Sequence, residues 1–416
     1  MQRTLTIALV SASGPDDEHT QSIHLRELSP ALAREATEDE DGSQVTLYAR
    51  RQDGAARTRG RLGPGATLQT LEAGPARPLE DEALLDHVRD LADGLRRRWS
   101  GAGRPDVVHA HGWIGGLAAC AVAREMDLPF AFTPHGLATI ELRAGRPAHP
   151  ARARMEKAIA AGARVIVTAC QDEAEALVRM GVPRKKISVI PYGVDTEQFC
   201  QVGPAMPRGE RDRLVTVSRD LEDGGVATAI RALAEVPDAE LAVAGGPDRD
   251  GVENDPAVHR LSLLAKELHV SDRVIFLGRM PRKSLPRLLR TARLVLSLSP
   301  DRPSPLVPLE AMACGVPVVA TPRGGAADSV LDQITGLHVP AGRPVPAGRA
   351  IRRLLSEETT LHGYSIAAAD RASSRYGWNR IAAEHLRAYE RLVPKPEPEP
   401  EPETGPDDEL AEALTM

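Results

Sequence analysis

Cysteine is scarce in this sequence, and the four cysteines stand far apart, at Cys120, Cys170, Cys200 and Cys314. No CxxC pair occurs, which argues against a disulfide framework and against a cysteine-rich zinc site. Few and widely spaced cysteines are typical of proteins in a reducing compartment, so we expect a cytoplasmic protein.

Long hydrophobic runs are also missing. The longest mostly apolar stretch, 112–123, is too short to cross a bilayer and is interrupted by glycines. At the N-terminus, Leu5, Ile7 and Leu9 alternate with other residues, which predicts a first strand and not an export signal. We therefore expect no transmembrane segment, and peripheral contact with a membrane stays open.

The body of the chain has no excess of charge of either sign. The formal net charge is −6, but residues 394–416 hold eight acids and one lysine, which is −7, so the rest carries +1 (−6 minus −7). A nearly neutral body excludes a general attraction to nucleic acid, and any anion must be held by a local site. The alternating Pro and Glu of residues 394–416 predict a disordered acidic tail.

What the sequence does have is length and a regular alternation of elements. Its 416 residues, 42% of them hydrophobic, suffice for two domains with cores. Strand-like runs alternate with amphipathic segments, which predicts an α/β protein of two Rossmann-like, doubly wound domains with parallel sheets, whose ligand binds in the cleft between them. The expected strands are 4–10, 44–49, 105–110, 129–133, 163–168, 187–190, 213–218, 239–244, 273–277, 293–298 and 316–320.

A stretch rich in glycine and proline, without apolar periodicity, separates the two sets of strands and predicts a linker. It divides the chain into a first domain, the linker, a second domain, a C-terminal helix and the acidic tail. These parts are expected at residues 1–198, 199–212, 213–377, 378–393 and 394–416.

Residues 292–325 carry the richest candidate site. A strand is expected to end near Ser299, and Glu310 falls in the first turns of the following helix. A carboxylate there can accept two hydrogen bonds from a ribose diol, and the N-terminus of the helix can face phosphates. On local spacing alone, a surface glutamate placed near a helix N-terminus is the better explanation.

The run LVPLEAMACGVPVVATPRGGAADSVLDQITGLHVPAG, however, resembles the donor-site signature of the family 4 retaining glycosyltransferases of the GT-B fold. The similarity extends through most of residues 4–393 and includes DVVHAHGWIGGLAA, TPHGL, SVIPYGVDTEQF and LVTVSRD. It implies an acceptor-side first domain, a nucleotide-sugar second domain and a C-terminal helix that returns to the first. It also implies retaining transfer of a hexose from a UDP- or GDP-linked donor to a hydroxyl acceptor, without a metal or other cofactor.

Taken position by position, the resemblance places His135 under the reacting sugar, Arg219 on the diphosphate and Glu310 on the ribose hydroxyls. Further contacts with the donor nucleotide are implied at Gly245, Gly246, Arg279, Met280, Leu306 and Val307. His109 and His111 lie two apart on one face of an expected strand. Without nearby cysteines or paired acids, we expect them to position the wall of the cleft and not to bind a metal.

Five positions depart from the family's pattern. Arg302 stands where the family has a glutamate that touches the sugar, and Pro305 has no N–H to offer. Gly224 replaces a lysine expected on the diphosphate, and His19 and Thr20 replace a Gly-Gly pair. Each lost charge-assisted hydrogen bond is worth roughly 1.5–3 kcal/mol. Two hypotheses therefore stay open: a glycosyltransferase, and a catalytically impaired GT-B protein that acts as a nucleotide-binding, regulatory or scaffold protein.

Overall fold

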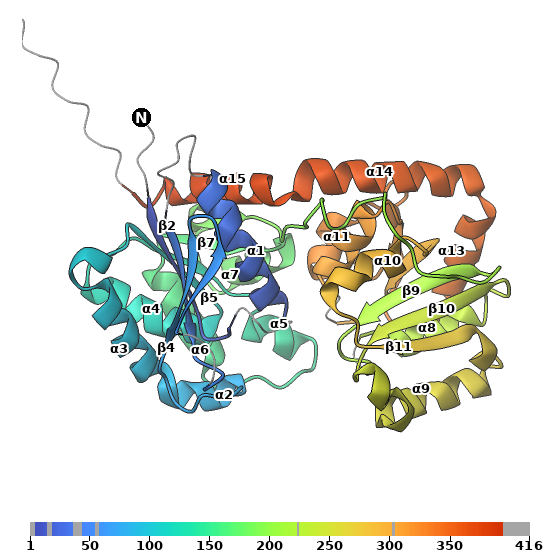
Figure 1. Ribbon diagram of the computed structural model, residues 1–416, viewed down its shortest axis with the longest axis horizontal. Helices are drawn as coiled ribbons and strands as arrows, with labels where there is room; N and C mark the ends of the chain where they lie inside the picture. The colour runs from blue at the N-terminus through green and yellow to red at the C-terminus, as the bar shows by residue number, and fades with distance from the viewer. Residues whose placement is uncertain are drawn as a thin grey trace, which may run out of the picture.

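The computed structural model describes residues 5–14, 19–35, 44–54, 58–222, 224–301 and 304–393. Arg302 and the expected acidic tail 394–416 lie outside the described residues. The described residues form two α/β domains that lie side by side and are spanned along one side by the last helices (Figure 1). The predicted fold of two doubly wound domains is confirmed.

Within the described residues, the first domain has an eight-stranded sheet in the order β3-β4-β2-β1-β5-β6-β7-β8. Its central strand β1 is fully paired, with Ile7 opposite Val45 on one side and Val107 on the other. The strands are β1 (Thr6–Ser11), β2 (Gln44–Arg50), β3 (Arg59–Gly63), β4 (Ala66–Leu71), β5 (Val107–His111), β6 (Phe130–Thr133), β7 (Val165–Thr168) and β8 (Ile187–Val189).

One pair of strands corrects the expectation of purely parallel sheets. β3 and β4 are antiparallel and were not predicted. They are joined by the two residues Pro64 and Gly65, and Gly65 has a φ of +65°, which glycine adopts easily in a tight hairpin turn. β3 is the edge strand and β4 is its neighbour, and both are only partly buried, so their sequence lacks the continuous apolar run of the inner strands.

Helices cover both faces of the first sheet. On α3 the side chains of Leu91, Leu95 and Trp99 recur every four residues, and all are buried. The helices are α1 (Thr20–Glu35), α2 (Asp81–Leu84), α3 (Val88–Trp99), α4 (Trp113–Glu125), α5 (Ala138–Arg143), α6 (Arg152–Gly162) and α7 (Gln171–Arg179).

The described part of the second domain contains a six-stranded parallel sheet in the order β11-β10-β9-β12-β13-β14. Its strands are β9 (Asp212–Ser218), β10 (Ala239–Gly245), β11 (Val274–Gly278), β12 (Leu294–Ser297), β13 (Val318–Ala320) and β14 (Gly336–His338). The helices are α8 (Val226–Leu233), α9 (Pro256–Glu267), α10 (Leu285–Leu289), α11 (Leu306–Ala313), α12 (Gly324–Ser329), α13 (Pro344–Ser356) and α14 (Glu358–Tyr376).

The last two helices connect the domains. α14 packs against α11 in the second domain, and α15 (Trp378–Tyr389) packs against α1 in the first (Figure 1). Ile381, Tyr389 and Leu392 are buried there. In the part of the chain that the structure describes, no helix combines the length and the apolarity needed to span a membrane.

Candidate functional site

Glu310 lies on α11, a helix of which all eight residues are buried. Its carboxylate, on a side chain only 3% exposed, forms an ion pair with the guanidinium of Arg282, which belongs to the 3₁₀ turn η6 (Arg282–Ser284) after β11. The guanidinium carbon of Arg282 also lies 5.1 Å from the ring centre of Phe199. Burial raises the pKa of Glu310, and the charge of Arg282 opposes that rise.

The N-terminus of α11 already has a weak cap of its own. The hydroxyl of Ser304 accepts hydrogen bonds from the backbone N–H groups of Leu306 and Val307, each at 3.4 Å. Pro305, which precedes the helix, has no N–H to add. Because hydrogen bonds of this length are weak, an anion can replace the hydroxyl at the helix N-terminus.

The loop after β9 is closed on itself. Arg219 is exposed and has no ion-pair partner among the described residues. The hydroxyl of Ser218 donates to the carbonyl of Asp220 at 2.6 Å, and the N–H of Gly224 donates to the same carbonyl at 2.9 Å. A Cβ added at Gly224 would stand 1.6 Å from the Ser218 Oγ and 2.4 Å from the Asp220 carbonyl oxygen. The loop therefore has no room for the lysine that the family pattern has there.

Two glycines at the end of β10 allow this loop to approach. A Cβ added at Gly245 would lie 1.8 Å from the Ser218 carbonyl oxygen, and one added at Gly246 would lie 2.6 Å from Leu221 Cδ1. Both residues have a positive φ, +124° and +73°, which side chains disfavour. Packing alone thus requires glycine at both positions, whatever a nucleotide does there.

The residues implied for the base lie next to that point. Arg279 follows β11, is exposed, and stands 3.6 Å from the Asp248 carboxylate. Its backbone N–H donates to the carbonyl of Pro247 at 2.7 Å, which ties the ends of β10 and β11 together. Met280 is partly buried against the second domain's core.

In the first domain, Thr20 begins α1, and His19 is exposed just before it. The His19 carbonyl accepts from the N–H of Ile23 at 2.9 Å, so it belongs to the first helical turn. The amide nitrogen of Gln21 donates to the hydroxyl of Ser11 at 2.9 Å and fixes the helix to the end of β1.

Five histidines form one cluster in the first domain, with neighbouring ring centres 4.1–6.0 Å apart. They are His24 on α1, His109 and His111 on β5, His135 after β6 and His385 on α15. Burial is the main cause that lowers the pKa of each ring, for His135 to about 3 and for His385 to about 4. All five rings are therefore neutral at pH 7.

The ring of His135 is held on both sides. Its Nδ1 is 2.7 Å from the Tyr192 hydroxyl, and its Nε2 is 2.8 Å from the Nδ1 of His111. The backbone of His135 has a φ of +54°, an uncommon conformation for a residue with a side chain. In this arrangement the ring reaches a sugar hydroxyl only by releasing one of its two partners.

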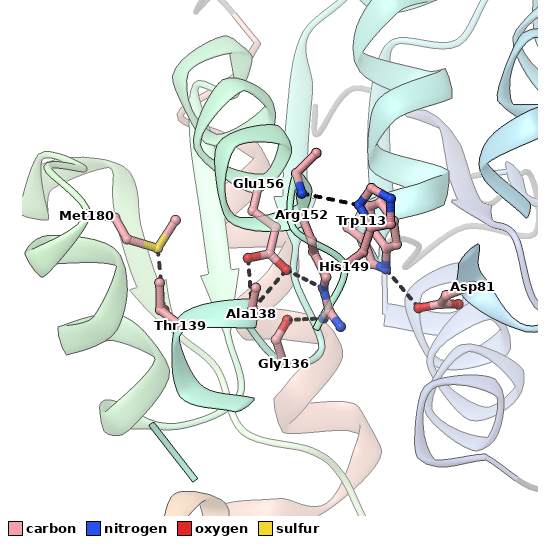
Figure 2. A network of polar contacts seen from close by, with 10 residues as sticks. Asp81, Trp113, Gly136, Ala138, Thr139, His149, Arg152, Glu156 and Met180 are labelled. Atoms are coloured by element: carbon pink, nitrogen blue, oxygen red, sulfur yellow. Dashed lines mark hydrogen bonds and ion pairs between the residues drawn. The ribbon is translucent and has the colours of Figure 1, made fainter. Parts of the chain in front are cut away.

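A second polar network includes the carbonyl of Gly136, the residue that follows His135 in the chain (Figure 2). Arg152 donates to the buried carboxylate of Glu156 at 2.7 Å and to the carbonyl of Gly136 at 3.2 Å. Its guanidinium carbon lies 5.5 Å from the ring centre of Trp113, whose N–H donates to Asp81 at 2.7 Å. The network fixes the loop after β6. Within the described residues, no group of three or more His, Cys, Asp or Glu side chains is arranged so that it could hold a metal ion.

Comparison with known proteins gives the family. The models for "Glycosyltransferase Family 4" and "Glycosyl transferases group 1" match residues 21–198 and 206–371. A D-inositol 3-phosphate glycosyltransferase of Frankia alni is 31% identical over 401 residues, which cover 91% of this chain and 96% of that protein. The chain belongs to the GT-B glycosyltransferases of the family 4 type.

Other relatives and solved structures agree. A D-inositol 3-phosphate glycosyltransferase of Mycobacterium avium is 28% identical, with 91% of each chain covered. Sucrose-phosphate synthase of Thermosynechococcus elongatus has a TM-score of 0.81 at 25% identity and covers 93% of this chain and 99% of its own. HepE of Anabaena, solved with UDP and glucose, has a TM-score of 0.71 at 17% identity and covers 93% and 100%.

The structure of this glycosyltransferase brings the predicted second-domain residues to one edge of one sheet. Arg219 follows β9, Gly245 ends β10 and Arg279 follows β11, and these three strands are neighbours. Glu310 comes after β12, on the other side of β9. Sequence reasoning missed Arg282, because nothing in the local pattern marks an arginine after Met280 as the partner of a carboxylate 28 positions away. It also missed the Arg152 network, whose one signal was the i, i+4 spacing of Arg152 and Glu156.

Proposed function

We propose that this glycosyltransferase moves a hexosyl group from a UDP- or GDP-linked sugar to a hydroxyl of a small polyol phosphate. The observation that carries the proposal is the buried carboxylate of Glu310, at the carboxyl edge of the second sheet beside the loops that hold Arg219 and Gly245. A buried carboxylate recognises a ribose diol with two hydrogen bonds. The relatives named for D-inositol 3-phosphate supply the acceptor class.

The reaction proposed retains the anomeric configuration and needs no metal. The bond from the anomeric carbon to the diphosphate oxygen breaks, and the acceptor oxygen forms a new bond on the same face. The departing diphosphate takes the acceptor's proton. Arg219 and the N-terminus of α11 stabilise the negative charge that develops on the leaving group.

A charged group beside His135 supports an anionic acceptor. The guanidinium of Arg152 is fixed by hydrogen bonds to Glu156 and to the Gly136 carbonyl. No described residue accepts a hydrogen bond from its Nη1. A guanidinium with an unengaged N–H suits a phosphate oxygen. Its side chain is 17% exposed, so its contact with solvent is small but real.

A second function is favoured by different observations. The closed loop at Gly224 and the ion pair on Glu310 reduce what the second domain offers to a diphosphate. A GT-B protein that binds a nucleotide and transfers no sugar would show this pattern, and it would act as a regulatory or scaffold protein.

One experiment separates the two functions. The full chain is titrated by calorimetry with UDP, GDP, ADP and their hexose conjugates, and then incubated with each bound conjugate and D-inositol 3-phosphate. Transfer, detected by mass spectrometry, with retention read from the anomeric coupling constant, supports the enzyme. Binding without transfer to this or other polyol phosphates supports the second function. Absence of binding to every nucleotide overturns both.

A further inference from the structure

The carboxylate that the proposed function gives to the ribose is occupied by another residue. Glu310 pairs with Arg282, and their side chains are 3% and 16% exposed. A vicinal diol needs both carboxylate oxygens, so a bound ribose competes with Arg282 for Glu310. Glu310 is thus paired with a cation that nucleotide binding must displace.

Arg282 is held from its far side by the segment that joins the two domains. Its guanidinium stacks over Phe199, and its backbone carbonyl accepts from the amide nitrogen of Gln198 at 3.3 Å. These contacts fix the backbone of η6 and the plane of the guanidinium. They leave the charged end with Glu310 as its one anionic partner among the described residues.

The diphosphate position has one of the two cations of the family pattern. The family pattern supplies two, but this chain has Arg219 and, in place of the lysine, Gly224, where the Ser218 hydroxyl fills the space of a side chain. A diphosphate carries more charge than Arg219 alone neutralises. A second cation has to come from another part of the site.

We propose that Arg282 serves two anions in turn, pairing with Glu310 before a nucleotide binds and with the diphosphate once it has bound. The inference rests on the proposed nucleotide site and names the residue that selects a phosphorylated ligand. The ribose hydroxyls take over Glu310, and the released guanidinium turns to the phosphates, which are attached to the same ribose through C5′. After the exchange the carboxylate accepts hydrogen bonds from the ribose hydroxyls and the guanidinium pairs with the phosphates, so neither charged group is left without a hydrogen-bond partner.

This exchange makes the phosphates a condition for binding the ribose. A nucleoside without phosphate separates Arg282 from Glu310 and offers the guanidinium nothing in return, so it binds poorly. A nucleoside diphosphate gives the guanidinium a new partner, because its phosphate oxygens accept charge-assisted, bidentate hydrogen bonds from Arg282. Arg282 therefore discriminates nucleotides from nucleosides.

The test is the variant Arg282→Gln, titrated by calorimetry with UDP and with uridine, and likewise with GDP and guanosine. We expect the affinity for the diphosphate to fall about 10- to 100-fold. The affinity for the nucleoside should stay the same or rise, because its competitor for Glu310 is gone. Arg282→Lys, which keeps the charge, should recover part of the diphosphate affinity.

Lys283→Gln is the matched control. Lys283 is the next residue, is exposed, and loses the same charge when substituted, but it has no contact with Glu310. It should leave both affinities unchanged. Arg282→Gln strips Glu310 of its cation, so thermal melting is recorded for it and for the double variant Arg282→Gln, Glu310→Gln, in which both charges are removed. If the single variant does not fold, Arg282→Lys and the double variant are compared instead, because the preference for UDP over uridine should fall in the double variant to what the unchanged Arg219 and α11 N-terminus provide.

Several results overturn the inference. An equal fall in the affinities for UDP and uridine shows that Arg282 only braces Glu310. An effect of Lys283→Gln as large as that of Arg282→Gln shows general electrostatic attraction. Failure of the folded native protein to bind any nucleoside diphosphate overturns this inference together with the proposed function, whereas equal falls leave the proposed function standing.

Discussion

The two domains differ in how the side chains of the predicted site are paired. In the first domain, His135 and its partners His111 and Tyr192 are paired with one another and surrounded by neutral rings. In the second, the loop that holds Gly224 is closed where the family has a lysine, and the carboxylate of Glu310 is paired with Arg282. The difference teaches that the departure at Gly224 is part of a well-packed structure and not a gap in it.

The first domain's dependence on α15 gives the largest expected effect. A chain that ends at Tyr376 loses the buried side chains of Ile381, Tyr389 and Leu392. Each is worth roughly 1.5–3 kcal/mol of burial, against a total stability of about 5–15 kcal/mol for a typical protein. We expect the first domain not to fold, as seen by loss of its melting transition in calorimetry.

The second domain should be affected less, because α14, which packs on it, remains. A chain that ends at Val393 is the control, since it retains α15 and should melt like the full chain. A truncation at Tyr376 that melts like the full chain would show that α15 does not support the first domain.

The next largest effect is expected at low pH, where the stability of the first domain should fall more than that of the second. The histidines have pKa values lowered in the folded state, to about 3 for His135 and about 4 for His385, against about 6.5 in the unfolded chain. Below pH 6.5 the unfolded chain takes up protons that the folded cluster refuses, so stability falls as the pH falls. Each such histidine removes up to about 1.4 kcal/mol per pH unit between pH 6.5 and its folded pKa.

Melting scans from pH 7 to pH 4 measure this effect. The transition of the first domain should move down steeply over that window, and that of the second domain should move much less. His385→Asn removes one titrating ring and should flatten the slope by about one fifth of the cluster's share. A slope that does not change in this variant would place the acid sensitivity outside the cluster.

Much of the fold could be predicted because inner strands of a parallel sheet are buried on both faces. Runs such as 241–244 are continuously apolar for that reason. The hairpin β3–β4 was missed because its strands are only partly buried, and β14 was missed because its sequence, GLH, has a single apolar side chain. These strands form because of their pairing with neighbouring strands, which the local sequence pattern does not indicate.

For the site, the sequence predicted individual positions but not the contacts between segments that lie far apart in the chain. His109 and His111 were noticed as a pair on one strand, but their contacts with His24 and His385 join segments far apart in the sequence. Such contacts depend on how α1 and α15 pack, which no local spacing encodes. The filled space at Gly224 likewise depends on the side-chain orientation of Ser218.

A smaller effect is expected on nucleotide affinity. Glu310→Gln keeps the side chain's shape but loses the charge that strengthens its bonds with the ribose, so UDP or GDP should bind more weakly by about 1.5–3 kcal/mol, measured by calorimetry. The 2′,3′-dideoxy nucleotide is the control ligand. It should bind the native protein poorly and respond little to the substitution, and equal losses for both ligands would place Glu310 away from the ribose.

The smallest effect concerns restoring the family's lysine. Gly224→Lys adds the missing cation, but its Cβ meets Ser218 Oγ at 1.6 Å and the backbone carbonyl of Asp220 at 2.4 Å. A neighbour that is backbone cannot turn aside, so the loop must open, at a cost of about 1–3 kcal/mol. We expect a lower melting temperature of the second domain and no gain in UDP affinity.

Gly363→Lys provides the matched control, because Gly363 lies in α14 with nothing within 4 Å of an added Cβ. It adds the same charge without the collision, and a helix interior favours lysine over glycine by up to about 1 kcal/mol. Its melting temperature should equal or exceed that of the native protein. If Gly224→Lys instead melts like the native chain and binds UDP more tightly, the loop after β9 opens at little cost. The second domain would then contain a donor site that lacks one cation, and the closed loop would not be a structural barrier to the family's lysine.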